Sequence, residues 1–153
     1  MRKYEFTGET RKIQLMFRTV TLHRIRAVIS FGLVDAGELG GWIEKEENLS
    51  HEGKAWVWGN AEVWGNAEVF SASHVLVIGP IGSRSDFTTF YRDKDNEITV
   101  KCGCFLGKID KFLEKVTRTH GNSKYALVYR AAVEVAKLQI DLSDEAPEED
   151  GEE

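Results

Sequence analysis

The stretch that decides the fold is Gly53-Lys-Ala-Trp-Val-Trp-Gly-Asn-Ala-Glu-Val-Trp-Gly-Asn-Ala-Glu-Val-Phe70. It repeats one six-residue pattern three times, and a degenerate fourth hexad follows. In each hexad the alanine and the valine are two residues apart, so both point to one face of an extended strand. The Gly-Asn pairs favour turns with positive φ. The pattern predicts a short hexad-repeat β-helix. Its interior would be lined by Ala55, Val57, Ala61, Val63, Ala67, Val69 and Val75.

Aromatic residues of the repeat fall on or near its outward positions, and the main ones are Trp56, Trp58 and Trp64. They predict either a packing surface for the rest of the chain or an exposed patch that binds a partner. The block makes only about one and a half turns of a left-handed β-helix, so flanking segments must cap it. Hexad β-helices also build acyltransferases with a catalytic histidine. His51 and His74 border the repeat, but it has too few coils for a substrate cleft.

The segment before the repeat predicts a β cap. Residues 13–29 alternate as two strands do, and Gly40 and Gly41 predict a turn-rich connection to the repeat. Arg24 and Arg26 would share one strand face, at a spacing that suits two successive phosphates. A solvated strand face explains the same pair more simply.

The segment after the repeat predicts a compact α+β unit. Strands are expected at residues 75–78, 87–92 and 97–105, the last two joined as an antiparallel hairpin. Two amphipathic helices follow, one ending at Gly121 and the next capped by Asn122 or Ser123. The predicted class is α+β: an N-terminal β cap and short β-helix over residues 1–76, then a β-hairpin with two helices over residues 77–140.

Charge is segregated along the 153 residues, although the chain carries a net charge of −5. Residues 1–30 have a net charge of +5, residues 31–70 of −6 and residues 71–140 of +4. Residues 141–153 hold eight acidic residues and no basic one, and this tail is predicted to be disordered. It would serve as a solubilising tail, or mimic nucleic-acid charge toward a basic partner.

Positive residues of the C-terminal unit predict a nucleic-acid or phosphate site. The loop at residues 79–85 presents glycines with Ser83 and Arg84, a composition that suits a phosphate. It lacks the Lys-Ser/Thr end of a P-loop, so nucleotide hydrolysis is not expected. Phe90 and Tyr91 lie beside Arg92, and such aromatic and basic surfaces bind single strands. The candidate nucleic-acid-binding residues are Ser83, Arg84, Arg92, Lys101, Lys124, Arg24 and Arg26.

Catalysis is a further hypothesis for the same unit. A metal-independent ribonuclease would use His120 as general acid or base, with Arg84 or Arg92 holding the phosphate. Histidines at helix ends more often interact with the helix dipole. Cys102 and Cys104 are predicted to be core residues, because structural zinc needs four ligands and no histidine lies at a suitable spacing. Neither a metal nor a cofactor is expected.

The chain resembles a group of small proteins carried by phages, prophages and other mobile elements. The motifs that carry the resemblance are Lys3-Tyr-Glu-Phe-Thr-Gly-Glu, Leu22-His-Arg-Ile-Arg-Ala, the segment Gly40–Gly53 and the Gly-Asn-Ala-x-Val hexads. Several members share an ending like Ile78-Gly-Pro-Ile-Gly-Ser-Arg and Cys102-Gly-Cys-Phe. Small proteins from such elements often act against host defence, and some anti-CRISPR proteins are similar in size and acidity. The resemblance implies no catalytic residues.

These observations lead to three functional hypotheses. The first is a counter-defence protein that binds and inhibits a host nucleoprotein, such as CRISPR-Cas9 with its guide RNA. The second is a ribonuclease that cleaves guide RNA, and the third is a structural β-helix protein that self-associates. No apolar run approaches the roughly 20 residues that cross a bilayer, and the start lacks the apolar stretch of a secretion signal. We therefore expect a protein of the bacterial cytoplasm without a membrane partner.

Overall fold

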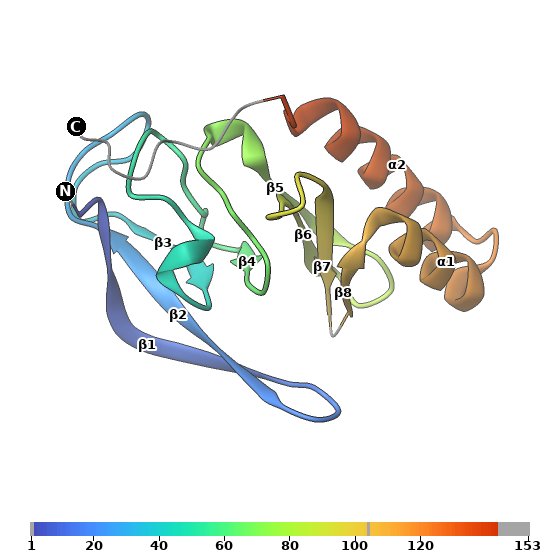
Figure 1. Ribbon diagram of the computed structural model, residues 1–153. Helices are drawn as coiled ribbons and strands as arrows, with labels where there is room; N and C mark the ends of the chain where they lie inside the picture. The colour runs from blue at the N-terminus through green and yellow to red at the C-terminus, as the bar shows by residue number, and fades with distance from the viewer. Residues whose placement is uncertain (1, 104, 144–153) are drawn as a thin grey trace.

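The computed structural model describes residues 2–103 and 105–143, which form two four-stranded sheets and two helices (Figure 1). The α+β class is therefore confirmed. The first sheet has the order β1 (Tyr4–Gln14), β2 (Thr19–Ala27), β3 (Leu39–Ile43) and β4 (Glu62–Val63). The second has the order β5 (Val75–Ile81), β6 (Asp86–Arg92), β7 (Ile98–Cys102) and β8 (Phe105–Lys108). Helices α1 (Ile109–His120) and α2 (Lys124–Gln139) follow. Cys104 and residues 144–153 of the acidic tail lie outside the described residues.

The aliphatic residues of the hexads point inward, as their two-residue spacing predicts. Six of the seven are buried and Val75 is half-buried. A β-helix is not confirmed, however. Within residues 53–74, β4 is the one regular strand, and it pairs in parallel with β3 of the cap rather than with another hexad. Leu49 forms a parallel bridge to Val69, which joins the leading segment to the last hexad.

Two glycines that the sequence suggested as turn residues lie instead inside a strand. Gly40 and Gly41 belong to β3, which passes directly over the turn at Gly59-Asn60 of the hexads. A Cβ on Gly41 would lie 2.2 Å from the backbone oxygen of Trp58, and one on Gly40 would lie 2.5 Å from the ring of Trp56. The glycines are therefore needed for the close approach of two backbones rather than for a turn.

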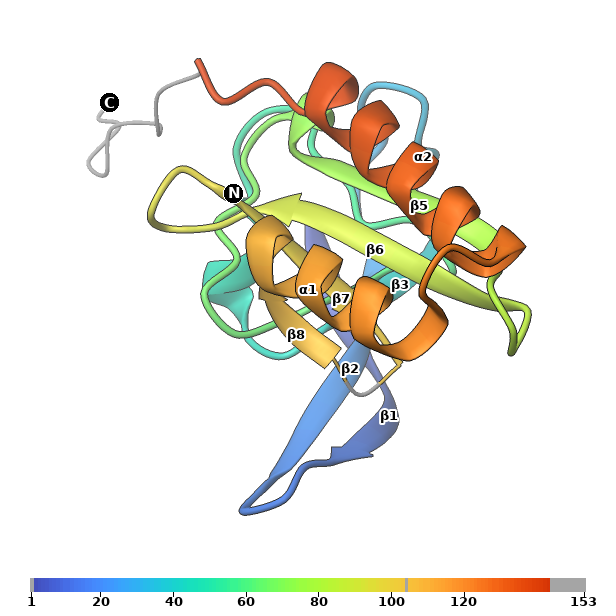
Figure 2. The same cartoon turned by 90° about the vertical axis from the view of Figure 1, so that its right-hand side faces the viewer.

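The predicted C-terminal hairpin is part of a four-stranded antiparallel sheet. The expected strand at residues 97–105 is interrupted at Gly103, whose φ of +59° starts the turn between β7 and β8. Both helices cover one face of this sheet (Figure 2). The opposite face packs on the hexads, where the hydroxyl of Tyr91 donates to the backbone oxygen of Trp64 at 2.6 Å. The two faces of the second sheet thus belong to two different apolar clusters, one with the hexads and one with the helices.

A buried carboxylate organises the turn between β6 and β7. Asp93 is fully buried and accepts hydrogen bonds from Thr99 at 2.6 Å and from Lys108 at 2.7 Å. Backbone N–H groups of Asp95 and Glu97 donate to it as well. Burial alone would raise the pKa of Asp93, but these donors outweigh it and hold that pKa below its usual range. The ionised form is therefore part of the fold.

We expect Asp93→Asn to lower the free energy of unfolding by about 2 kcal/mol at pH 7, because hydrogen bonds to a charge are lost. The unfolded chain takes up a proton near pH 4, whereas folded Asp93 does so only at lower pH. The wild type should therefore lose stability below pH 4, and the variant should lose less. Urea unfolding between pH 3 and 7 measures both. Asp95→Asn is the control, since that side chain is exposed. If the unfolding free energies of the wild type and of Asp93→Asn changed equally with pH, ionised Asp93 would not be the source of the stabilisation.

Candidate functional site

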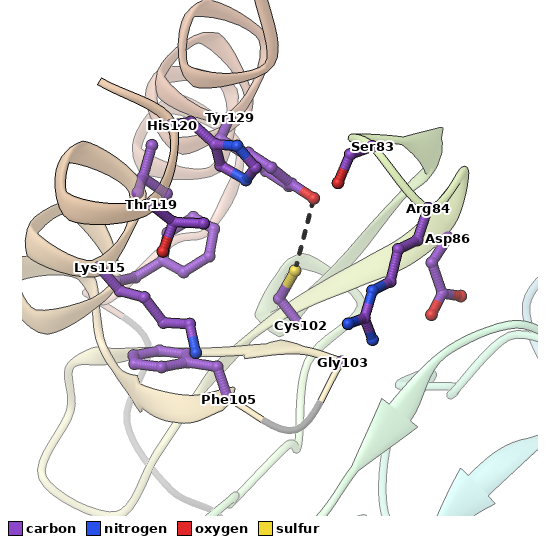
Figure 3. A pocket seen from close by; sticks show the side chains of 12 residues that line it. Ser83, Arg84, Asp86, Cys102, Gly103, Phe105, Lys115, Thr119, His120 and Tyr129 are labelled. Atoms are coloured by element: carbon purple, nitrogen blue, oxygen red, sulfur yellow. Dashed lines mark hydrogen bonds between the residues drawn. The ribbon is translucent and has the colours of Figure 1, made fainter. Parts of the chain in front are cut away.

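A pocket of about 330 Å³ lies between the two helices and the ends of the second sheet (Figure 3). The β5–β6 loop forms one wall, the β7–β8 turn lies below, and the C-terminal end of α1 with the middle of α2 closes the other sides. Its polar lining consists of Ser83, Arg84, Asp86, Cys102, Lys115, Thr119, His120 and Tyr129. Three residues predicted from the sequence, namely Ser83, Arg84 and His120, are therefore brought together.

A chain of hydrogen bonds runs beneath the pocket. Thr88 donates to the sulfur of Cys102 at 3.5 Å, and the Cys102 thiol donates to the hydroxyl oxygen of Tyr129 at 3.9 Å. The hydrogen of the Tyr129 hydroxyl is therefore free to point into the pocket. Burial, reinforced by the neighbouring Cys102, raises the pKa of Tyr129 to about 12. Near neutral pH, Tyr129 is thus a hydrogen-bond donor and not an anion.

Two cations, Arg84 and Lys115, line the pocket without an ion pair to any described residue. Arg84 comes from the β5–β6 loop and Lys115 from α1, and neither forms an ion pair with any residue in the described ranges. The Lys115 ammonium lies 5.9 Å from the ring centre of Phe105. Asp86 is the single carboxylate of the lining, and it lies beside Arg84 (Figure 3). The pocket is consequently rich in donors and positively charged.

His120 reaches the pocket from the last residue of α1. Its ring stacks on Tyr129, with centroids 5.7 Å apart and an interplanar angle of 27°. Tyr125 lies at the same centroid distance on another side. The helix ends here because Gly121 adopts a φ of +59°. His120 is therefore held by ring contacts at the edge of a basic pocket.

The β5–β6 loop approaches Tyr129 too closely for a side chain at residue 82. Gly82 has a φ of +81°, and a Cβ there would lie 1.9 Å from the Tyr129 hydroxyl oxygen. This contact fixes the position of the loop directly before Ser83 and Arg84. The glycine therefore places both candidate phosphate-binding residues against α2.

Two predicted nucleic-acid residues have structural roles instead. Arg92 is only 7% exposed and donates to the backbone oxygen and the carboxylate of Glu68. Lys101 is 8% exposed and forms an ion pair with Glu62. The partners of both side chains, Glu68 and Glu62, belong to the hexads, so these contacts connect the second sheet to the repeat. Neither side chain lines the pocket.

The remaining predicted cations also lie away from the pocket. Arg24 pairs with Glu9 at 3.3 Å, and Arg26 pairs with Glu5 at 2.8 Å, so their own strand neighbours neutralise both. Lys124 is exposed at the first residue of α2. The sequence prediction that these residues hold phosphates therefore has no support from their surroundings.

The tryptophans divide between the core and the surface. Trp56 and Trp64 are buried, with exposed fractions of 3% and 1%, so the packing alternative applies to them and not the exposed patch. Trp58 is 42% exposed. It is the one of the three whose ring remains accessible to a partner.

Several pocket residues were not predicted as site residues. Lys115 and Thr119 lie four residues apart on α1 and line the same side of the pocket as His120. Tyr129 was expected only in the apolar stripe of α2, and Cys102 only in the core. Their helical and strand periodicities showed that they face inward. No local pattern showed that an open pocket lies there.

The histidine that leads the repeat is engaged by the cap. The Nδ1 atom of His51 accepts the backbone N–H of Lys3 at 2.9 Å, and its Nε2 lies 2.8 Å from the Glu46 carboxylate. Its ring also stacks on Tyr4 at 4.0 Å. Both ring nitrogens are therefore occupied: Nδ1 joins the start of the chain at Lys3 to the segment that leads into the hexads, and Nε2 bonds within that segment.

Comparison with known proteins gives a limited relationship. No protein-family model matches the chain. An alignment 62 positions long, which covers 38% of the chain, is 37% identical to the "Uncharacterized acetyltransferase YdcK" of Escherichia coli (strain K12). That stretch covers 19% of the Escherichia coli protein, so the chain spans about a fifth of its length. The match is consistent with a hexapeptide-repeat-like segment.

Residues 2–103 and 105–143 contain neither a membrane-spanning helix nor a metal-binding cluster. None of the helices in that part of the chain is long and apolar enough to cross a membrane. Those residues also contain no cluster of three or more His, Cys, Asp or Glu side chains placed to hold a metal ion.

Proposed function

We propose that this protein binds RNA in the pocket between α1, α2 and the second sheet, and that it acts in this way on a host nucleoprotein such as Cas9 with its guide RNA. One observation carries the proposal: Arg84 and Lys115, both without an ion-pair partner among the described residues, line one pocket together with hydroxyl donors and aromatic rings. The other predicted cations are paired or lie elsewhere.

The chemistry of the pocket suits RNA better than a neutral ligand. Phosphates contribute most of the affinity in nucleic-acid complexes, and arginine and lysine bind them. Bases of single-stranded RNA stack on aromatic and histidine rings, and His120 and Phe105 provide such rings at this pocket. The hexads and the cap would serve as scaffold, because their aromatic rings are largely buried.

Acetyl transfer is not the function that we propose. The chain covers only about a fifth of the acetyltransferase that it matches. The histidine at the start of the repeat has both ring nitrogens occupied by structural contacts, so it is poorly placed to act as a general base.

The first test is direct RNA binding. We expect Arg84→Ala and Lys115→Ala each to weaken the binding of a labelled single-stranded RNA by about tenfold, because each removes a charge-assisted contact. Fluorescence anisotropy at one fixed salt concentration measures the dissociation constants. Lys124→Ala is the matched control, since it removes an exposed cation outside the pocket. Equal weakening by all three variants would show general charge attraction and would contradict a specific pocket.

The nucleoprotein part of the proposal has its own test. Wild type should co-purify with Cas9 loaded with guide RNA and reduce its cleavage of target DNA, whereas Arg84→Ala should do neither. Absence of a complex at low salt would reject Cas9 as the partner. Light scattering of the same purified protein tests the self-associating alternative from the sequence, which a clean monomer would exclude.

RNA cleavage is a second candidate because His120 and Arg84 line the same pocket. His120 would accept a proton, while Tyr129, whose pKa is raised to about 12, would act only as a donor. Gel analysis of the RNA after incubation in EDTA separates cleavage from binding. Products that disappear in His120→Ala would establish the ribonuclease, and intact RNA that stays bound would establish the binding protein.

A further inference from the structure

We infer that the pocket holds a terminal phosphate monoester of an RNA chain, rather than a phosphodiester within the chain. This inference rests on the proposed function and names the part of the RNA that the pocket takes. It follows from three features of the lining: the kind of hydrogen-bonding groups, the amount of positive charge and the size of the space.

Nearly every polar group of the lining can donate a hydrogen bond. The hydroxyls of Ser83 and Tyr129 point toward each other across the top of the pocket, and Arg84 extends along its side (Figure 3). Cys102 already donates to the oxygen of Tyr129, which leaves the Tyr129 hydrogen for a ligand. Lys115 and Thr119 add donors from α1. A ligand with several acceptor oxygens on one atom, such as phosphate, matches this set.

The charge of the lining matches a monoester better than a diester. A phosphate monoester carries a charge of about −1.5 to −2 near pH 7, whereas an internal diester carries one negative charge. Arg84 and Lys115 together supply two positive charges that no carboxylate of the described residues neutralises through an ion pair. Only Asp86 in the lining opposes them. A terminal phosphate would therefore be the better electrostatic match.

The size and walls of the pocket favour a chain end. A volume of about 330 Å³ is at the lower end of the range for small-ligand sites and accommodates roughly one nucleotide. Helix α1, helix α2 and the β5–β6 loop stand around it (Figure 3). A continuous strand would need to enter and leave, whereas a terminal nucleotide only needs to enter. His120 lines the pocket, and its ring stands at the edge where the terminal base would lie.

The decisive experiment compares three RNAs of one sequence: one with a 5′-phosphate, one with a 3′-phosphate and one with hydroxyls at both ends. We expect one phosphorylated RNA to bind at least about tenfold more tightly than the hydroxyl RNA. Arg84→Ala should remove this preference and Lys124→Ala should keep it. Equal binding of all three RNAs would overturn the inference but leave RNA binding intact. No binding of any RNA would overturn both.

The rate at which Cys102, a residue of the pocket lining, is alkylated tests the same inference without RNA. In a Cys104→Ser background, iodoacetamide should modify Cys102 several-fold more slowly when a nucleoside 5′- or 3′-monophosphate is present at saturating concentration. The corresponding nucleoside should have little effect, because it lacks the phosphate. Equal protection by nucleoside and nucleotide, or no protection by either, would contradict phosphate binding between Arg84 and Lys115.

Discussion

Replacing Gly41 with alanine should lower the free energy of unfolding by about 3 kcal/mol or more, which is among the largest effects of any conservative change in this chain. The new Cβ would lie 2.2 Å from the backbone oxygen of Trp58 and 2.6 Å from that of Ala61. Backbone atoms cannot rotate away as a flexible side chain can. Strand β3 would have to shift, and the hydrogen bonds from Gly41 to Val57 and from Trp42 to Ala61 would be strained.

Gly59 provides the matched control for this substitution. It lies in the turn that Gly41 contacts, but a Cβ at Gly59 meets nothing within 4 Å. We expect Gly59→Ala to change stability by less than about 0.5 kcal/mol. Urea unfolding followed by tryptophan fluorescence gives both values. Similar stabilities for the two variants would mean that β3 does not press against the hexad turn.

Replacing Lys3 with alanine should destabilise the protein by about 3 kcal/mol. Lys3 is 1% exposed, and its ammonium donates to the backbone oxygen of Ala55 at 2.7 Å and to those of Glu52 and Gly53 at 3.5 Å. It also lies 4.8 Å from the ring centre of Phe31. The substitution would leave the buried oxygen of Ala55 without this donor and open a cavity between the cap and the first hexad.

The pH dependence of the free energy of unfolding tests whether the Lys3 ammonium is buried in the folded protein. Burial lowers the pKa of Lys3 to about 8, although the charge of Glu52 partly opposes this. Between pH 8 and 10 the unfolded chain therefore binds more protons at this residue than the folded protein does. The stability of the wild type relative to Lys3→Met, which has no titratable group, should rise with pH over that range. A constant or falling difference would contradict the burial of the charge, and Lys12→Met, an exposed lysine of β1, is the control.

Local sequence patterns predicted the features that depend on near neighbours in the chain. The alanine and valine spacing of the hexads identified a buried set, because side chains alternate along any extended segment. The apolar stripes of α1 and α2 identified both helices, because helical periodicity is equally local. The same reasoning placed Ser83 and Arg84 in a loop suited to phosphate, and the structure places both in the pocket.

Features that depend on contacts between distant segments were missed. Gly40 and Gly41 suggested turns, because a glycine does not reveal that another backbone will lie against it. The fourth strand of the second sheet, β8, was missed, because the strand predicted at residues 97–105 reaches only its first residue and the turn at Gly103 separates it from β7. Lys3 looked like any basic residue near a terminus, yet it is buried against the hexads.

The sequence by itself determined that the hexads bury an aliphatic face and that the C-terminal half is a sheet with two helices, because periodicity is set by the backbone geometry of each segment. Only the tertiary structure decided which cations remain free to bind a ligand. Arg92 and Lys101 are paired with Glu68 and Glu62, which lie 24 and 39 residues away in the chain. Arg84 and Lys115 form no ion pair with a carboxylate of the described residues. Ion pairs between distant residues form only when the chain is folded, so no local pattern reveals them.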